Sequence, residues 1–279
     1  MVYLSPRPTE KSSGLFYQNE EYLPFASLSG TSSLTDRMYR TVRRLNLRWK
    51  RSLVERYWRG ARAAKPGRLL DVGCGTGEFL NTMKKGGWYV EGWERDEKAS
   101  SWARTHWGIN IQTGKVEDIP EGSGAFDVIT LWHVLEHLYD PGLALRVLSA
   151  RLSANGYLIV AVPNIAGVDS RVYRENWIAL DVPRHVNHFS AGSLAAILAA
   201  HGFEESGCRQ LPFDAFFNTL MSESIAARRG WNYPLLWPLR LIRAGVVSAA
   251  SLIGGSPVLD ARSGATTIGI YCRSGNVEV

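Results

Sequence analysis

Cysteine is scarce in this chain and is not arranged in pairs. The 279 residues include three cysteines, Cys74, Cys208 and Cys272, which lie far apart and form no Cys-x-x-Cys motif. An odd number of widely spaced cysteines argues against a disulfide framework and favours a reducing compartment. We therefore expect a fold held together by its apolar core, for which a hydrophobic content of 45% is ample.

Long uncharged apolar runs are missing as well. The N-terminal segment MVYLSPRPTEKSSG has no apolar stretch behind a basic start, which argues against a secretory signal. No run of about 18 uncharged apolar residues occurs, which argues against a membrane-spanning helix. These two absences lead us to expect a cytoplasmic protein.

Positive charge is concentrated in one segment. The chain carries a net charge of +6, yet residues 36–68 contain twelve Lys or Arg and two acids, so the rest of the chain has a net charge of −4. This segment either presents a solvated helix face or meets an anionic partner such as phosphate or lipid. Its apolar residues recur every three or four positions and predict a long helix that begins near Thr35 and stops at Pro66-Gly67. They are Met38, Val42, Leu45, Trp49, Leu53 and Tyr57.

The chain divides into two parts by composition. Residues 1 to about 35 are rich in Ser, Pro, Gly and Thr and predict an irregular arm, docked through the rings of Phe16, Tyr17, Tyr22 and Phe25. We therefore place an arm and the basic helix at 1–65 and the main domain at 66–279, with an apolar helical insertion at 213–260.

Short apolar runs alternate with helical stretches from Arg68 onward. This alternation is typical of the α/β class, with a mostly parallel sheet covered by helices on both faces. We expect strands at 68–72, 89–93, 109–112, 126–131, 157–162, 204–211 and 265–273, and helices from Glu78 and at 97–107, 143–152 and 190–201.

A glycine-rich turn joins the first expected strand to the helix from Glu78. The strand contains Asp71, and the turn follows as Gly73-Cys74-Gly75-Thr76-Gly77. Glycines let a ligand approach the backbone closely, and the helix N-terminus adds unpaired N–H groups. The GxGxG spacing differs from the GxGxxG of dinucleotide sites, and no Gly-Lys-Ser/Thr follows, so both a nicotinamide cofactor and a P-loop are excluded. Asp71 suits the cationic end of a ligand, such as a methionyl ammonium.

Two motifs carry a resemblance to a known family. LLDVGCGTGEFL, at 69–80, resembles the first motif of class I S-adenosylmethionine (SAM)-dependent methyltransferases. FDVITLWHVLEHLYDP, at 126–141, is similar to a later motif of small-molecule methyltransferases, including the ubiquinone-biosynthesis O-methyltransferases. The resemblance spans about residues 68–203. It implies a Rossmann-like, doubly wound sheet of seven strands, SAM as the cofactor and a small-molecule acceptor.

The resemblance also implies the cofactor contacts. In the family, an acid at the end of the second strand holds the ribose hydroxyls, and Glu94 fits that position better than Glu91, which lies earlier in the strand. Lys115 stands where the family has an Asp near adenine, so Val116 or Glu117 takes that contact. The implied set is Asp71, Gly73, Cys74, Gly75, Gly77, Glu94, Val116, Glu117 and Leu131.

Polar residues follow the strand expected at 126–131, where ligands bind in such sheets. The spacing of His133, Glu136 and His137 places all three on one face of a helical turn, and His185 and His188 follow later. An oxygen acceptor must lose a proton, which a histidine base can accept. The candidate catalytic residues are His133, Glu136, His137 and His188.

Three interpretations of this histidine group stay open. We expect a general base and polar substrate contacts without a metal. A divalent metal site, completed by His185 or His188, is the alternative, because some related methyltransferases carry Glu, Glu and His at the positions of His133, Glu136 and His137. Helix capping or packing is the third.

The most apolar segment is 231–254. Its two arginines, Arg240 and Arg243, make it costly to span a bilayer, by roughly 2.5–3.5 kcal/mol for each central Arg. We expect a lid over the acceptor pocket, a buried helix or a dimer face. A helix that lies on a membrane surface beside the basic helix is the alternative, and would add a peripheral contact with the inner membrane face.

The sequence thus indicates O-methylation of a sugar, a lipid-linked intermediate or a quinone-like molecule. The basic segment keeps an RNA or protein methyltransferase open, although no RNA-binding module is recognisable and a nucleic-acid partner is not expected. A membrane-associated protein that keeps the SAM fold without catalysis is a third candidate.

Overall fold

The computed structural model describes residues 1–17, 34–61, 66–120, 125–228, 237–254 and 262–273, and a seven-stranded sheet forms its centre. The strands are β2 (Arg68–Val72), β3 (Tyr89–Glu94), β4 (Asn110–Thr113), β5 (Phe126–Trp132), β6 (Leu152–Pro163), β8 (Phe203–Gln210) and β9 (Thr266–Arg273). Their order is β4-β3-β2-β5-β6-β9-β8, and β9 runs antiparallel to both of its neighbours while the other pairs are parallel. The expected Rossmann-like α/β sheet is confirmed.

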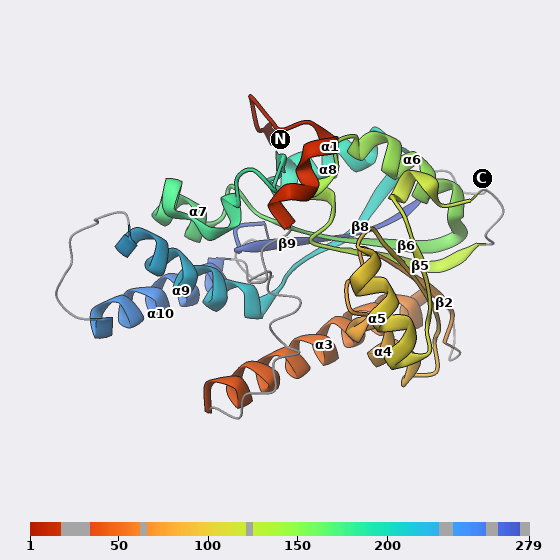
Figure 1. The fold of residues 1–279 in the computed structure, drawn as a ribbon, viewed down its shortest axis with the longest axis horizontal. Coiled ribbons are helices and arrows are strands. Elements are labelled where there is room, and N and C mark those ends of the chain that lie inside the picture. The colour runs from red at the N-terminus through yellow and green to blue at the C-terminus, as the bar shows by residue number, and fades with distance from the viewer. Residues whose placement is uncertain (18–33, 62–65, 121–124, 229–236, 255–261, 274–279) are drawn as a thin grey trace.

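Helices cover both faces of this sheet (Figure 1). One face carries α6 (Pro141–Arg151) and α8 (Ala191–Ala199), and the other carries α3 (Leu34–Ala61), α4 (Glu78–Lys84) and α5 (Glu97–Trp107). The strands separate two apolar cores, because successive side chains of a strand point to opposite faces. The consequence is a sheet whose central strands β2, β5 and β9 are largely buried on both sides, whereas the edge strands β4 and β8 are partly exposed.

Leu69 and Leu70 illustrate this division. Leu69 packs in the core beneath α3, α4 and α5, whereas Leu70 packs in the core beneath α6 and α8. Both side chains are at most 3% exposed. Burying a leucine side chain stabilises the fold by roughly 1.5–3 kcal/mol relative to leaving it in water, so β2 is firmly fixed just before the glycine turn.

Only the second half of the long basic helix α3 packs on the sheet. Leu53 and Val54 are buried, whereas Val42 and Leu45 are 43% and 44% exposed. Figure 1 shows the first half of α3 extending beyond the sheet. The apolar stripe predicted for this helix is therefore covered only toward its C-terminal end, because no other described element lies over its beginning.

The described part of the N-terminal arm, residues 1–17, is docked through its backbone. Its strand β1 (Val2–Tyr3) pairs antiparallel with β7 (Asn187–His188), so backbone groups of both segments find partners. The Tyr139 hydroxyl also donates to the Pro8 carbonyl across 3.0 Å. Phe16 is 41% exposed, so the predicted docking through this ring is wrong. The side chains of the other three rings named in that prediction lie outside the described residues.

The insertion before β9 forms two helices, α9 (Pro212–Arg228) and α10 (Trp237–Gly254), which pack against each other and against α7 (Val168–Tyr173). Figure 1 shows these three helices grouped at one end of the molecule. Residues 231–236 of the apolar segment lie outside the described residues. Among the helices that the structure describes, none combines the length and the apolarity needed to cross a membrane.

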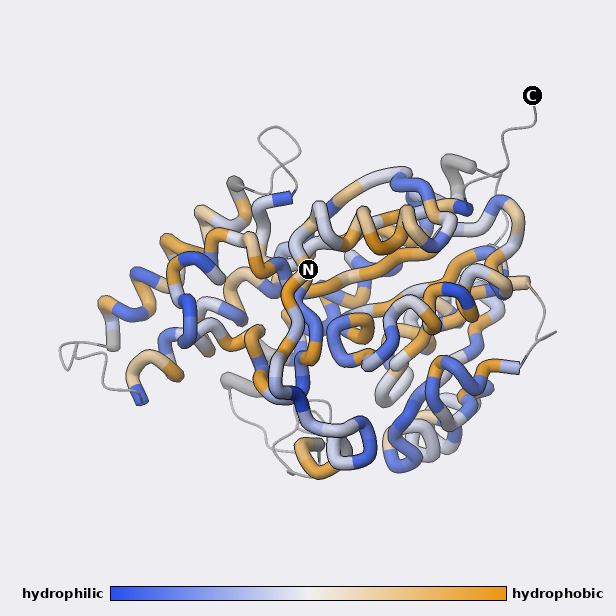
Figure 2. Tube along the Cα trace, turned by 90° about the horizontal axis from the view of Figure 1, so that it is seen from above, coloured by the Kyte–Doolittle hydropathy of each residue, from blue (hydrophilic) through white to orange (hydrophobic). Residues whose placement is uncertain are grey.

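The paired helices α9 and α10 bury small apolar residues together with polar ones, and they expose several large apolar side chains. The hydroxyl groups of Thr219 and Ser248 lie 2.6 Å apart in their buried interface. Phe216, Ile242 and Val246 point outward instead, with exposed fractions of 54%, 61% and 63%. The apolar residues of α9 and α10 appear as orange stretches at that end of the molecule in Figure 2. The apolar periodicity of this outward face is thus exposed in the single chain, and the lid, buried helix or dimer face expected for this segment stays a prediction.

Candidate active site

The glycine turn after β2 has the conformation that its sequence requires. Gly73, Gly75 and Gly77 have φ values of +67°, +52° and +71°, in the left-handed region that favours glycine. A Cβ at Gly73 would also overlap the side chain of Val134, in the segment that follows β5. The turn thus needs glycine at Gly73 for two reasons, and it lies directly against the loop that carries the histidines.

Glu94, the last residue of β3, contacts this turn. Its Oε2 accepts a hydrogen bond from the backbone N–H of Gly75 across 2.7 Å, and its Oε1 accepts one from that of Asp96 across 2.9 Å. Burial raises the pKa of Glu94, although both hydrogen bonds counteract it. Glu91 instead pairs with Arg68 at 2.8 Å, toward the amino ends of the strands. The structure thus places Glu94, and not Glu91, at the turn.

Asp71 lies beneath the turn and is almost completely buried. Its side chain is 3% exposed, and its Oδ1 accepts a hydrogen bond of 2.6 Å from the Thr130 hydroxyl. Burial raises the pKa of Asp71 to about 7, against the opposing effects of that hydrogen bond and of the Lys50 ammonium. Before a cationic ligand binds, the Asp71 carboxyl is therefore about half protonated at neutral pH.

Lys50 is a residue of this site that sequence reasoning missed. It comes from α3, and its Nζ lies 4.5 Å from the centre of the Trp132 ring at the end of β5. Burial lowers the pKa of Lys50, while Asp214 and Asp71 raise it. Only a weak feature of the sequence could have identified Lys50 as a site residue. It lies three and four residues before the buried Leu53 and Val54, on the same face of the helix.

His133, the first residue after β5, connects two acids. Its Nε2 lies 2.9 Å from Asp214 Oδ2, and its Nδ1 lies 3.3 Å from Glu136 Oε1. Burial lowers the pKa of His133, but the two carboxylates outweigh it and raise the pKa to about 9, so the ring is charged at neutral pH. Asp214, at the start of α9, also accepts a hydrogen bond of 2.7 Å from the Thr266 hydroxyl. Sequence reasoning missed Asp214, which had no motif around it.

The backbone at His133 differs from the helical turn that the spacing predicted. His133 has a φ of +58°, which is uncommon for a residue with a side chain and is typical of functional sites. The following turn, η3 (Leu135–His137), is a 3-10 helix of three residues. The prediction that His133, Glu136 and His137 share one face of an α-helical turn is therefore wrong. The loop instead turns His133 toward Glu136 and Asp214.

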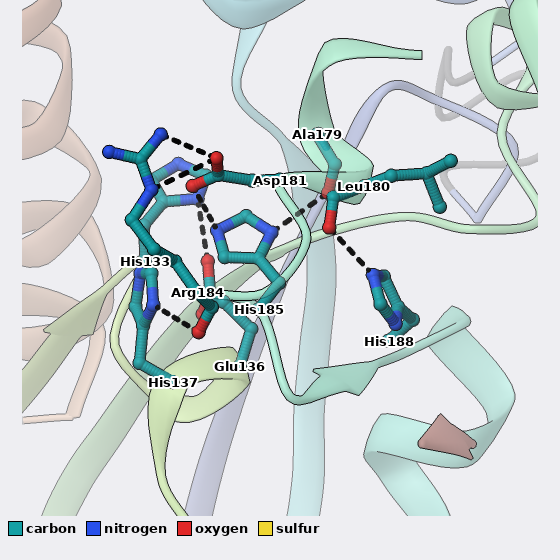
Figure 3. Close-up of polar contacts among 9 residues, drawn as sticks. All are labelled: His133, Glu136, His137, Ala179, Leu180, Asp181, Arg184, His185 and His188. Atoms are coloured by element: carbon teal, nitrogen blue, oxygen red, sulfur yellow. Dashed lines mark hydrogen bonds and ion pairs between the residues drawn. The ribbon is translucent and has the colours of Figure 1, made fainter. Parts of the chain in front are cut away.

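A second group forms where His137 meets the loop before β7. His137 Nδ1 donates to the Arg184 carbonyl across 3.1 Å, and His185 Nδ1 donates to the Ala179 carbonyl across 2.8 Å. The centres of the two rings are 4.6 Å apart. Glu136 completes the group, and Figure 3 shows its carboxylate beside both histidines. Burial lowers the pKa of His185 to about 4, so that ring is neutral.

His188 is not brought into this group. Its Nε2 contacts the Leu180 carbonyl at 3.0 Å, and its ring centre lies 6.2 Å from that of His185. Figure 3 shows it apart from Glu136 and His137. Its catalytic role stays a prediction without a contact that favours it.

The remaining predicted cofactor residues surround the turn. Val116, in η2 (Val116–Asp118), is 4% exposed, and Leu131 is fully buried, which leaves mainly its backbone for a ligand. Burial raises the pKa of the Cys74 thiol well above its usual value, which favours the neutral thiol. Lys115, at the position where the family has an acid, pairs with Glu10 of the N-terminal arm at 2.5 Å. The arm thus reaches the loop after β4.

These groups together form one site at the carboxyl ends of β2, β3 and β5, the edge at which ligands bind in open α/β sheets. One side offers the glycine backbone of the turn and two acids, Asp71 and Glu94, which suit a ligand with hydroxyl and ammonium groups. The other side offers imidazoles and carboxylates, which suit a hydroxyl that must lose a proton. The contact between Gly73 and Val134 joins the two sides.

Known proteins resemble this chain in sequence and in fold. Residues 40–205 match the model of a family described as a methyltransferase domain. A protein of Caulobacter sp. (strain K31) named ubiquinone biosynthesis O-methyltransferase is 37% identical over 103 residues, which cover 35% of this chain and 41% of that protein. A protein of the same name from Xanthomonas campestris pv. campestris (strain B100) is 29% identical over 195 residues, 67% of this chain and 78% of that protein. The match thus spans about two fifths of the first relative and more of the second.

A solved structure supports the fold independently. The magnesium protoporphyrin IX methyltransferase from Synechocystis PCC 6803 with bound SAH superposes with a TM-score of 0.51 at 16% identity, over 68% of this chain and 88% of that one. At this identity the likeness extends to the architecture of the sheet and its helices.

Proposed function

The chain belongs to the methyltransferase-domain family, and from this premise we propose that it transfers a methyl group from SAM to an oxygen of a small molecule. Its fold is that of a class I SAM-dependent methyltransferase, and its cofactor is SAM. The relatives named ubiquinone biosynthesis O-methyltransferase support oxygen as the acceptor atom. The observation that carries the proposal is the contact between Gly73 and Val134, because it sets the histidine loop beside the donor turn.

The donor side has candidate partners for the ribose and for both charged groups of the methionyl end of SAM. Glu94 has carboxylate lone pairs beside the turn that can accept the two ribose hydroxyls. Asp71 pairs in its ionised form with the methionyl ammonium. Lys50, a partly buried cation on the same side, suits the methionyl carboxylate.

The reaction is an in-line displacement. The acceptor oxygen forms a bond to the methyl carbon while the bond from that carbon to the sulfonium breaks, and the electron pair of the broken bond stays on sulfur. The products are a methyl ether or ester and S-adenosylhomocysteine, and the acceptor hydroxyl releases one proton. Holding donor and acceptor in line can lower the barrier by roughly 7 kcal/mol or more in the best cases.

Glu136 and His137 are proposed to bind the acceptor hydroxyl, with His133 as the residue that positions Glu136. His133 lies 3.3 Å from Glu136 Oε1 and anchors this loop to α9 through Asp214. His137→Ala should therefore lower turnover by more than it lowers SAM affinity. If His137→Ala lowered SAM affinity as much as it lowered turnover, His137 would lie on the donor side instead.

The paired helices α9 and α10 favour a lipid-linked acceptor among the candidate classes. Their outward apolar side chains, Phe216, Ile242 and Val246, suit a lipid surface better than water. Arg40, Arg44 and Arg48 on α3 are exposed and would add attraction to anionic lipid. The chain should sediment with vesicles that contain anionic phospholipid, and the double variant Ile242→Ser with Val246→Ser should sediment less.

A screen with methyl-labelled SAM tests the acceptor class. Cell extract is separated into lipid, sugar and RNA fractions, and each is incubated with the chain. Label in the lipid or sugar fraction supports the proposal. Label in the RNA fraction alone would favour the RNA methyltransferase that the basic segment left open.

A further inference from the structure

The described part of the N-terminal arm contacts loops on both sides of the site. It begins at β7, where the Leu4 N–H also donates to the Val186 carbonyl across 3.0 Å. It next meets Tyr139, which follows β5, and then Lys115, which follows β4. Its short helix α1 (Glu10–Ser13) lies on the donor side. The arm therefore runs from the acceptor side to the donor side, along the edge at which ligands bind in such sheets.

Two contacts anchor α1 beside Glu94, the acid that suits the ribose of SAM. Lys115 Nζ pairs with Glu10 Oε1 at 2.5 Å. Arg95, the residue after Glu94, donates from Nη2 to the Ser13 hydroxyl across 3.3 Å. The Ser13 side chain is only 6% exposed, so this end of α1 is packed against the body of the protein. The helix thus lies at the nucleoside end of the cofactor site.

Lys115 gives the arm a rigid anchor. Its backbone N–H donates to Asp118 Oδ2 across 2.9 Å, and its carbonyl accepts a hydrogen bond of 2.7 Å from the Trp93 indole. The preceding residue, Gly114, donates its N–H to the Glu94 carbonyl across 3.0 Å. The backbone of Lys115 is therefore tied to the strand that ends in Glu94, and its side chain reaches from there to the arm.

The arm is held a second time on the acceptor side. The Tyr139 hydroxyl donates to the Pro8 carbonyl across 3.0 Å, and the Arg7 guanidinium lies 5.0 Å from the centre of the Tyr139 ring. The pairing of β1 with β7 fixes the backbone before these residues. The segment between Pro8 and Ser13 is thus attached at both of its ends.

We propose that residues 1–17 form a strap over the nucleoside end of bound SAM, and that the ion pair of Lys115 with Glu10 holds this strap closed. Glu10 and Lys115 are then positioning residues, which act on the cofactor by keeping α1 in place. Adenine carries no charge at neutral pH, so enclosure by a protein segment retains it where an ion pair cannot. The strap concerns SAM binding alone and does not depend on the identity of the acceptor.

The strength of the ion pair suits a segment that opens in every catalytic cycle. The side chains of Lys115 and Glu10 are 47% and 41% exposed, and water and salt weaken such pairs. Loss of the pair should therefore raise the dissociation rate of SAM only about two- to fivefold. A much stronger pair would slow the release of S-adenosylhomocysteine, which must leave after each transfer.

Charge reversal in the full chain tests the strap. Labelled SAM is bound, unlabelled SAM is added in excess, and the dissociation rate is measured. Glu10→Lys and Lys115→Glu each bring like charges together and should raise the rate by at least about threefold. The double variant, Glu10→Lys with Lys115→Glu, restores an opposite pair at the net charge of the wild type. It should release SAM at about the wild-type rate.

Lys11→Glu is the matched control. Lys11 is exposed on the same helix, and its reversal changes the net charge as Lys115→Glu does, so it should leave the rate unchanged. Tyr139→Phe removes the hydrogen bond to Pro8 at the other end of the strap and should raise the rate. Urea unfolding shows whether the variants are folded.

Three results would overturn the strap. The first is an unchanged dissociation rate in both single reversals. The second is a double variant that releases SAM as fast as the single variants do. The third is a Lys11→Glu variant that releases SAM as fast as Lys115→Glu, because the rate would then follow net charge and not the contact between the arm and the loop after β4.

Discussion

The carboxylate of Glu94 accepts a hydrogen bond from the backbone N–H of Gly75 across 2.7 Å. This contact joins the end of β3 to the turn after β2 and so places an acid beside the glycine backbone. A ribose bound there would meet the acid and the turn together. The proposed cofactor site depends on this relationship more than on any other.

Two similar substitutions in the glycine turn should lower the free energy of unfolding by different amounts. Gly75→Ala meets no atom within 4 Å, so it should cost only the strain of a left-handed backbone, about 1–2 kcal/mol of unfolding free energy. Gly73→Ala adds an overlap with Val134 and should cost more. Urea unfolding of both variants checks this, and equal losses would show that the packing against Val134 has been misjudged.

SAM affinity should depend on pH through Asp71. The pKa of Asp71 is about 7, and the methionyl ammonium pairs with the ionised form. Affinity should therefore rise with pH by roughly tenfold per unit below pH 7 and level off above it. Calorimetry between pH 5.5 and 8.5 measures this. Asp71→Asn should remove the dependence, and an unchanged slope in that variant would assign the titration to another group.

Lys50 should shift this pH dependence. Its ammonium lowers the pKa of Asp71, so Lys50→Met should raise that pKa and move the rise in SAM affinity to higher pH. The variant should also bind SAM more weakly at pH 7. Arg48→Met, an exposed cation on the same helix, is the control and should leave the profile in place. The same shift in both variants would indicate a general charge effect.

The sequence predicted the sheet and its glycine turn well because the residues that specify each of them lie close together along the chain. Alternation of strands and helices, the three glycines and Glu94 can all be read within 30 residues of one another. Lys50 and Asp214 could not be predicted, because α3 and α9 bring them to the site only through tertiary packing. The helical turn at His133 was wrong because the spacing of polar residues does not reveal a φ of +58°.

The insertion shows a second limit of periodicity. An apolar stripe predicts one face of a helix, but it does not say what covers that face. In α9 and α10 a hydrogen bond between Thr219 and Ser248 and an ion pair between Glu223 and Arg243 join the two helices, while large apolar side chains lie on the exposed side. The sequence of a single chain does not specify which surface covers that apolar stripe.

The most direct test of the account compares SAM binding by Glu94→Ala and Glu91→Ala. Both substitutions remove a carboxylate from β3, but only Glu94 contacts the turn, whereas Glu91 pairs with Arg68. We predict that calorimetry shows a loss of SAM affinity of about tenfold or more for Glu94→Ala, equivalent to 1.4 kcal/mol or more. Glu91→Ala should bind SAM as the wild type does. Unchanged affinity in Glu94→Ala, or an equal loss in both variants, would contradict the placement of the cofactor at the carboxyl ends of β2 and β3.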